Sequence, residues 1–246
     1  MPLLDNDMET HQLAGGHFGF SATRIDTLGA SEYTLVTIAA DTSGSISGFE
    51  REIEKCLKSV VEACKYDKRA DNLMLRLTKF HSRIEEVHGF KPLADCKLPA
   101  YDNCIQAQGS TVLYDAATSA IEATIAYGRS LSAADFAVNA IVFVLTDGEN
   151  NGSILTAGEV KRALERAVKD EAVESIVSVL VGINVGDPRL SKYLSDLQRD
   201  AGFTQYVELK DAGPKTLAKL ASFTSKSISA QSQALGTGGP SQALTI

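Results

Sequence analysis

Three short runs of apolar and β-branched residues stand out along the chain. They span residues 33–40 (YTLVTIAA), 140–146 (AIVFVLT) and 175–183 (SIVSVLVGI). Unbroken runs of this length are typical of strands buried on both faces, which occur in parallel sheets covered by helices. The pattern therefore predicts a mostly parallel central sheet.

Stretches with helical periodicity follow or separate these runs. Apolar residues recur three and four positions apart over residues 49–64, 113–125, 160–168 and 190–197, as expected for helices that bury one face. In the first of them Cys56 and Cys64 share the apolar face, so we expect both thiols to be buried. Three pairs of residues have the spacing of helix starts: Ser47 with Glu50, Thr156 with Glu159, and Asp187 with Pro188.

Two further segments, residues 72–80 and 83–90, are typical of strands joined by a tight connection at His81 and Ser82. They predict an antiparallel hairpin at one edge of the sheet. The predicted order from residue 33 is then β, α, β, β, α, β, α, β, α, β, α. This alternation indicates an α/β fold with a Rossmann-like open sheet, mostly parallel with one antiparallel edge strand, and helices on both faces.

The two ends of the chain differ from this middle part in their residue pattern. Residues 1–32 have no sustained periodicity, and the last twenty residues, from Ser227, carry no charge and are rich in Ser, Gln and Gly. We therefore expect an irregular N-terminal arm (1–32), one domain (33–226) and a flexible C-terminal tail (227–246).

The composition of the chain argues against some classes of function. The 246 residues carry a formal net charge of -7, which argues against nucleic acid or a membrane as partner because both attract clustered Lys and Arg. The start of the chain lacks the pattern of a signal peptide, and the four cysteines contain no CxxC pair. We expect reduced thiols and a cytoplasmic protein, although a bridge between Cys96 and Cys104 is conceivable.

Oxygen-bearing side chains follow the predicted strands. DTSGS (residues 41–45) ends the first buried run, Thr111 precedes the second helical period, and TDG (residues 146–148) ends the next buried run. In open α/β sheets, ligands bind at the carboxyl ends of the strands. Carboxylate and hydroxyl oxygens are ligands for hard divalent cations, so the sequence predicts a metal site.

This combination of motifs resembles the metal-ion-dependent adhesion site (MIDAS) of the von Willebrand factor type A (vWA) family, and the resemblance covers residues 33–223. It implies a Mg²⁺ or Mn²⁺ ion at the five matching positions: Asp41, Ser43, Ser45, Thr111 and Asp147. By the same resemblance, an open coordination position accepts an acidic residue from a partner protein, and the chain is not an enzyme.

The form of the motif is more similar to stand-alone microbial or phage members of the family than to extracellular receptors. Such relatives often work beside a MoxR-type AAA+ ATPase, which is one candidate partner. A second hypothesis is a structural or assembly component, for example of a phage particle, whose arm and tail engage neighbouring subunits.

A third hypothesis is a Mg²⁺-dependent phosphate-ester hydrolase, since such enzymes also place an aspartate at the end of a first strand. The position two residues after Asp41 is Ser43 rather than a second carboxylate, and no Walker A motif occurs. The four histidines are expected to lie away from the strand ends and to pack rather than bind metal: His11, His17, His81 and His88.

Overall fold

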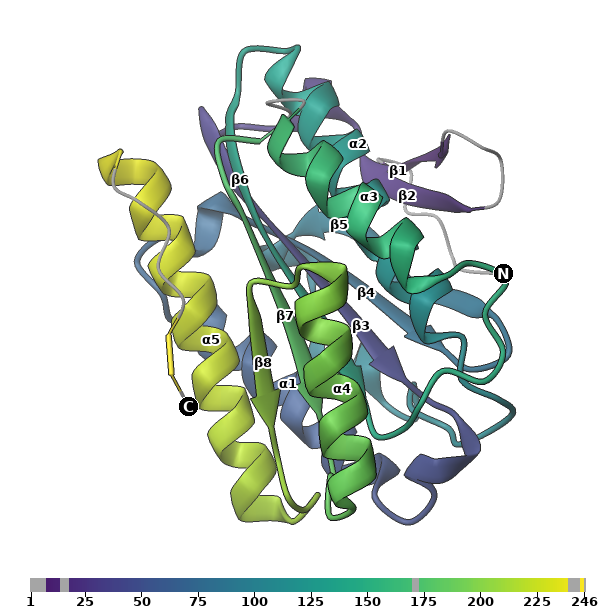
Figure 1. Ribbon diagram of the computed structural model, residues 1–246. Helices are drawn as coiled ribbons and strands as arrows, with labels where there is room; N and C mark the ends of the chain where they lie inside the picture. The colour runs from purple at the N-terminus through teal and green to yellow at the C-terminus, as the bar shows by residue number, and fades with distance from the viewer. Residues whose placement is uncertain (1–7, 14–17, 170–172, 239–243, 246) are drawn as a thin grey trace.

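A computed structural model describes residues 8–13, 18–169, 173–238 and 244–245, and it places an eight-stranded sheet between two layers of helices (Figure 1). Across the sheet the strand order is β1-β2-β5-β4-β3-β6-β7-β8. The strands are β1 (Met8–Gln12), β2 (Gly19–Thr23), β3 (Glu32–Asp41), β4 (Leu73–Phe80), β5 (Ile84–Pro92), β6 (Ala137–Thr146), β7 (Ile176–Gly182) and β8 (Gln205–Glu208).

Five α-helices in the described residues cover the two faces of the sheet: α1 (Glu50–Lys65), α2 (Leu113–Ser132), α3 (Ala157–Lys169), α4 (Pro188–Ala201) and α5 (Pro214–Thr237). Apolar side chains of α1 and α5 pack on one face, and those of α2, α3 and α4 pack on the other. The predicted Rossmann-like α/β fold is confirmed, including the order of elements from β3 onward. Among the described residues, no helix has both the length and the apolar character that a membrane crossing requires.

The central strand β3 shows why the buried runs do not alternate between apolar and polar residues. Val36 and Ile38 point into the core beneath α1 and α5, whereas Leu35 and Ala39 point into cores on the opposite face. Helices cover both faces, so apolar residues are required at consecutive positions. β3 pairs in parallel with β4 and β6, and its last residue, Asp41, lies opposite Phe80.

The described part of the N-terminal arm contains two strands, where the sequence predicted an irregular segment. β5 runs antiparallel to β4 as predicted, but it is not an edge strand, because β2 pairs with β5 and β1 pairs with β2. The Glu86 carboxylate holds β2 in place by accepting from the Ser21 amide (3.1 Å) and the Ser21 hydroxyl (2.8 Å). A Cβ at Gly89 would lie 1.9 Å from the Ser21 carbonyl oxygen, so this close approach needs glycine.

The predicted start of a flexible tail at Ser227 is also wrong, because α5 continues to Thr237. Its buried face there is largely polar. The Gln231 side chain donates to the Ala140 carbonyl (3.1 Å) and the Ser175 hydroxyl (3.0 Å), and the Gln231 main-chain carbonyl accepts from the Asn139 side-chain amide (2.6 Å). Hydrogen bonds to the sheet thus replace part of the usual apolar contact. Residues 239–243 and 246 of the expected tail lie outside the described residues.

Two of the three predicted helix starts are confirmed. The Thr156 amide donates to the Glu159 carboxylate (2.8 Å), and the Asp187 carboxylate accepts from the Arg189 amide (2.8 Å) at the start of α4. The prediction for Ser47 is wrong: the N-cap of α1 is Phe49, with no capping side chain.

The four cysteines are free thiols, so the conceivable bridge between Cys96 and Cys104 is absent from the described structure. Cys56 and Cys64 face the core as predicted. Burial raises the pKa of each of these two thiols to about 12, which keeps them protonated and unreactive at neutral pH.

His88 is a buried, neutral histidine on β5. Its Nδ1 lies 2.9 Å from the Gly89 carbonyl oxygen, which can only accept, so Nδ1 carries the proton and Nε2 accepts from the Tyr101 hydroxyl at 2.8 Å. Burial lowers the pKa of His88 from 6.5 to about 4, and the charges of Lys91 and Arg76 act in the same direction.

We therefore expect His88 to destabilise the protein progressively as the pH falls from 6.5 towards 4. Below pH 6.5 the unfolded chain binds a proton that the folded chain does not, and the loss reaches roughly 3 kcal/mol near pH 4. Urea unfolding of wild type and His88→Gln across this range isolates the effect. If the difference in unfolding free energy between the two proteins does not change with pH, the folded protein does not hold His88 neutral.

Candidate metal centre

The loop after β3 is fixed against its neighbours at the carboxyl edge of the sheet, the lower edge in Figure 1. The Thr42 amide donates to the Phe80 carbonyl (2.8 Å), and the Thr42 carbonyl accepts from the Gln108 amide (2.9 Å). The Gly44 amide donates to the Gly109 carbonyl (3.2 Å). These bonds bring the loop that carries DTSGS against the segment that carries Thr111.

Asp41 is buried and its carboxylate is held in one orientation. Oδ1 accepts from the Ser43 amide (2.8 Å), and Oδ2 accepts from the Thr146 hydroxyl (2.6 Å). Thr146 is the last residue of β6, so the bond links the ends of two adjacent strands. Sequence reasoning missed Thr146; its only signal is its place directly before Asp147.

A chain of hydroxyls connects Asp41 with the second carboxylate. The Ser43 and Ser45 hydroxyl oxygens lie 3.0 Å apart, and the Ser45 hydroxyl donates to Asp147 Oδ1 at 2.6 Å. A Cβ placed on Gly148 would lie 3.8 Å from both the Ser45 and the Thr111 hydroxyl oxygens, so Thr111 faces the same space. The structure therefore brings all five predicted residues together from three loops.

The chemistry of these donors fits a hard divalent cation. Magnesium binds oxygens at 2.0–2.1 Å in an octahedron, so adjacent ligand oxygens lie roughly 2.9 Å apart. The 3.0 Å between the Ser43 and Ser45 oxygens matches this spacing. Among the described residues no three His, Cys, Asp or Glu side chains cluster as metal ligands, so a site here depends on its hydroxyl oxygens.

The two carboxylates lie in a setting that disfavours their charge. Burial raises the pKa of Asp41 to about 6; hydrogen bonds from Thr146 and Ser43 oppose this shift, and the charge of Asp147 adds to it. Burial also raises the pKa of Asp147, against the hydrogen bond from Ser45. The apolar side chains of Ile46, Leu145 and Ile183 line the hollow beside the two aspartates. A bound cation would offset the cost of holding two negative charges there.

One of the five proposed donors, Ser45, is exposed to solvent. Its neighbour Gly44 is exposed as well, and Asp147 keeps 9% of its surface accessible, whereas Asp41, Ser43 and Thr111 lie buried. A cation at this edge could therefore be reached by a group from outside the molecule.

The loop between β6 and α3 is tied to the segment that carries Thr111. The Thr111 amide donates to the Asn151 side chain (2.7 Å), and the Thr111 carbonyl accepts from the Asn151 (3.0 Å) and Gly152 (3.1 Å) amides. Ser153 Oγ accepts from the Tyr114 amide (3.0 Å) at the start of α2. The sequence gives no signal of these bonds, because they join residues about 40 positions apart.

One histidine lies closer to this edge than expected. His81 follows β4, beside the end of β3, and its carbonyl accepts from the Val112 amide (3.0 Å). Its buried ring nitrogens have no hydrogen-bond partner among the described residues. The expectation that His81 lies away from the strand ends is therefore wrong, while His17 lies outside the described residues.

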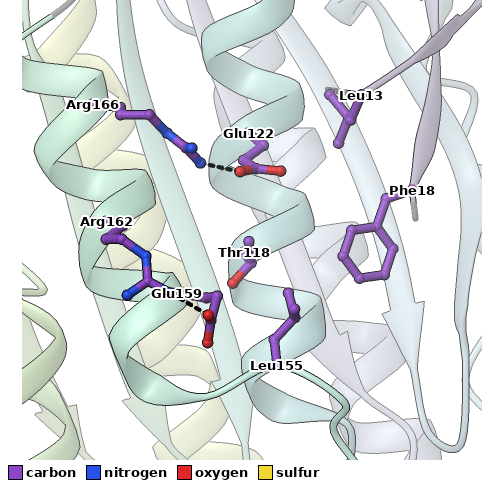
Figure 2. Close-up of a pocket in the computed structure, with 8 residues that line it drawn as sticks. All are labelled: Leu13, Phe18, Thr118, Glu122, Leu155, Glu159, Arg162 and Arg166. Carbon is purple, nitrogen blue, oxygen red and sulfur yellow. Dashed lines mark hydrogen bonds and ion pairs between the residues drawn. The ribbon is translucent and has the colours of Figure 1, made fainter. Parts of the chain in front are cut away.

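A separate cavity of about 140 Å³ lies between α2, α3 and the β1–β2 hairpin (Figure 2). Its charged side chains pair with each other, Glu122 with Arg166 and Glu159 with Arg162. Leu13 and Phe18 from the hairpin form the opposite wall. The hairpin therefore shapes a cavity of its own, and none of the five proposed metal ligands lines it.

Comparison with known proteins shows likeness in structure only. No protein-family model matches the chain, and no curated protein matches its sequence. Among solved structures, the PilB minor pilin of Streptococcus sanguinis superposes with a TM-score of 0.62 at 14% identity, over 89% of this chain and 66% of the pilin. Proximal thread matrix protein 1 of the mussel byssus gives 0.55 at 18% identity, over 82% of this chain and 47% of that protein.

The likeness is one of fold. A further structure of the mussel protein has a zinc-occupied MIDAS motif and a TM-score of 0.51 at 17% identity, covering 81% of this chain and 46% of that one. These matches support a vWA-like fold of the kind that carries a divalent metal site in the mussel protein. The chain spans less than two thirds of the length of these neighbours, so the activities of the whole neighbouring proteins do not transfer to it.

Proposed function

We propose that the chain is a non-enzymatic, metal-dependent protein-binding module. Asp41, Ser43, Ser45, Thr111 and Asp147 would hold Mg²⁺ or Mn²⁺ and leave a coordination position for an aspartate or glutamate of a partner protein. The observation that supports the proposal is the convergence of these five side chains at one edge of the sheet, where Ser45 is exposed to solvent. The cation would supply a positive charge that attracts the partner's carboxylate.

This proposal is favoured over the two alternative functions, an assembly component and a phosphate-ester hydrolase. The main argument for an assembly component was that its two ends are free to engage neighbouring subunits. The described parts of both ends instead pack on the chain's own sheet. For a hydrolase, Ser43 places a hydroxyl where a second carboxylate of the motif would stand. Turnover of a generic phosphate ester that is abolished by Asp41→Ala would favour the hydrolase instead.

Partner and location stay predictions. A MoxR-type AAA+ ATPase or assembly subunits would have to present an accessible acidic residue. The free thiols favour a reducing compartment such as the cytoplasm, whereas two of the structural neighbours are a pilin and a byssus protein.

The direct test is binding to short immobilised peptides with a central aspartate, compared with the same peptides carrying asparagine. With Mn²⁺ or Mg²⁺ present, we expect the aspartate peptides to bind at least tenfold more strongly, because only a charged carboxylate both coordinates and neutralises the cation. EDTA should remove the difference. Equal binding of both peptide sets in the presence of metal would contradict the proposed function.

A further inference from the structure

Ile154 is an unusually exposed apolar residue. Among the described residues, only two large hydrophobic residues are exposed, Ile154 with 87% of its surface accessible and Tyr66 with 85%. Ile154 lies in the loop that connects β6 to α3, within a polar stretch from Asn150 to Thr156. Folding leaves this side chain in water, so burial in the protein's own core does not explain it.

The backbone that carries Ile154 is held firmly. The Asp115 carboxylate accepts from the Ile154 amide (3.1 Å) and the Leu155 amide (2.8 Å). On the other side of Ile154, the Ser153 hydroxyl accepts from the Tyr114 amide (3.0 Å) and the Asp115 amide (3.2 Å). Asp115 is itself buried. The loop thus presents a β-branched side chain, which has few rotamers, at a fixed position, so little conformational entropy remains to be lost on binding.

The same contacts place Ile154 on the loop that follows Asp147 and is bonded to the segment of Thr111. It follows Asp147 by seven residues, and its amide is bound to a residue four positions after Thr111. The loop between these points is fixed to Thr111 by the reciprocal bonds of Asn151. Leu155, the next residue, lines the end of the cavity beside α2 in Figure 2. Ile154 is therefore an exposed apolar side chain on a loop that is fixed to two of the proposed metal ligands, directly at Thr111 and through the chain at Asp147.

We propose that Ile154 determines which acidic segments bind, by packing against an aliphatic or aromatic side chain that flanks the carboxylate at the metal. This inference rests on the proposed function and specifies the partner's chemistry: a protein segment in which an aspartate or glutamate has an apolar neighbour. The metal accepts any accessible carboxylate, whereas the contact with Ile154 distinguishes one acidic segment from another. Burying an isoleucine side chain of this exposure corresponds to roughly tenfold in affinity.

Tyr66 provides a matched control. It follows the last residue of α1, shortly before β4 begins at Leu73, and Leu73 lies opposite Thr34 near the start of β3. Tyr66 is as exposed as Ile154. Its position before β4 places it at the opposite edge of the sheet, where β3 and β4 begin. A general effect of removing surface hydrophobicity would appear in both variants, whereas an effect on recognition at the metal should appear only at Ile154.

The experiment uses the full chain, with wild type, Ile154→Ser and Tyr66→Ser compared on a peptide array in Mn²⁺. Each peptide has a central aspartate in a Gly/Ser background, and one position within three residues of it is set in turn to Leu, Phe, Ser or Lys. An asparagine-centred set and an EDTA wash run in parallel. Mn²⁺ binding by electron paramagnetic resonance and thermal unfolding check that each variant keeps its metal affinity and fold.

We expect wild type to bind the best Leu or Phe peptides roughly tenfold more strongly than their Ser counterparts. Ile154→Ser should bring this ratio close to one while keeping the requirement for aspartate and metal, and Tyr66→Ser should retain the wild-type ratio. The inference is overturned if Ile154→Ser keeps the preference, if Tyr66→Ser loses it equally, or if wild type shows none. Loss of the aspartate requirement in wild type would instead overturn the proposed function, and this inference with it.

Discussion

Replacing Asp41 with alanine should abolish stabilisation of the protein by Mg²⁺ or Mn²⁺. A cation that binds only the folded state, at a hundred times its dissociation constant, adds about 2.7 kcal/mol to the free energy of unfolding. For a chain of this size that corresponds to a rise of roughly 5–10 °C in melting temperature. Asp41 supplies a buried carboxylate that Ser43 and Thr146 hold in place, so its loss should remove the response.

Thermal unfolding in EDTA, Mg²⁺ and Mn²⁺ measures this effect. Glu149→Gln is the matched control, because Glu149 is an exposed carboxylate only two residues after Asp147. It removes the same charge from the same edge and should leave the metal response intact. A wild-type protein whose melting temperature is unaffected by millimolar metal, or an Asp41→Ala variant that still responds, would remove the main support for a metal centre.

Deleting residues 227–246 should unfold the protein or leave it without fixed packing. The deletion removes the second half of α5, including the buried side chains of Ile228 and Leu235. Each is worth about 2–5 kcal/mol by analogy with truncation to alanine. It also removes Gln231, which leaves Asn139 on β6 without its hydrogen-bond acceptor. The sum approaches the whole stability of a typical domain, about 5–15 kcal/mol.

Point variants test this prediction if the deletion variant does not fold. Ile228→Ala should lower the free energy of urea unfolding by about 2–5 kcal/mol, whereas Gln233→Ala, at an exposed position of the same helix, should change it by less than about 0.5 kcal/mol. A deletion variant with wild-type stability would mean that this half of α5 contributes nothing to the fold.

The same helix explains where sequence reasoning succeeded and where it failed. From β3 to the middle of α5 the elements follow from the pattern, because each buries an apolar face or both faces of an apolar strand. The end of α5 buries Ser227, Gln231 and Ser232 beside only two apolar residues, so its buried face is largely polar and no sustained apolar period marks it. In β1 most side chains are at least partly exposed, and β2 is fixed by Glu86, a residue 65 positions away.

The candidate site likewise has a part that the sequence predicts and a part that it does not. The convergence of its five proposed ligands was predictable because they directly follow strands or precede a helix, and the fold brings those points to one edge. The groups that orient them were not predictable. Thr146 on Asp41, and Asn151 and Asp115 along the loop of Ile154, act through pairings that exist only once the chain has folded.

The hairpin of β1 and β2 also changes which strand forms the border of the sheet. A sheet that ended at β5 would present the unpaired backbone amides and carbonyls of a strand that includes the buried Phe90, and such an edge can recruit a strand from another copy. The hairpin caps this edge at Phe90 and moves the exposed border to β1, where Glu9 and Thr10 face solvent. The border strand β1 has five residues and a charged side chain, so it is a poorer template for intermolecular sheet growth than the nine-residue β5 would be.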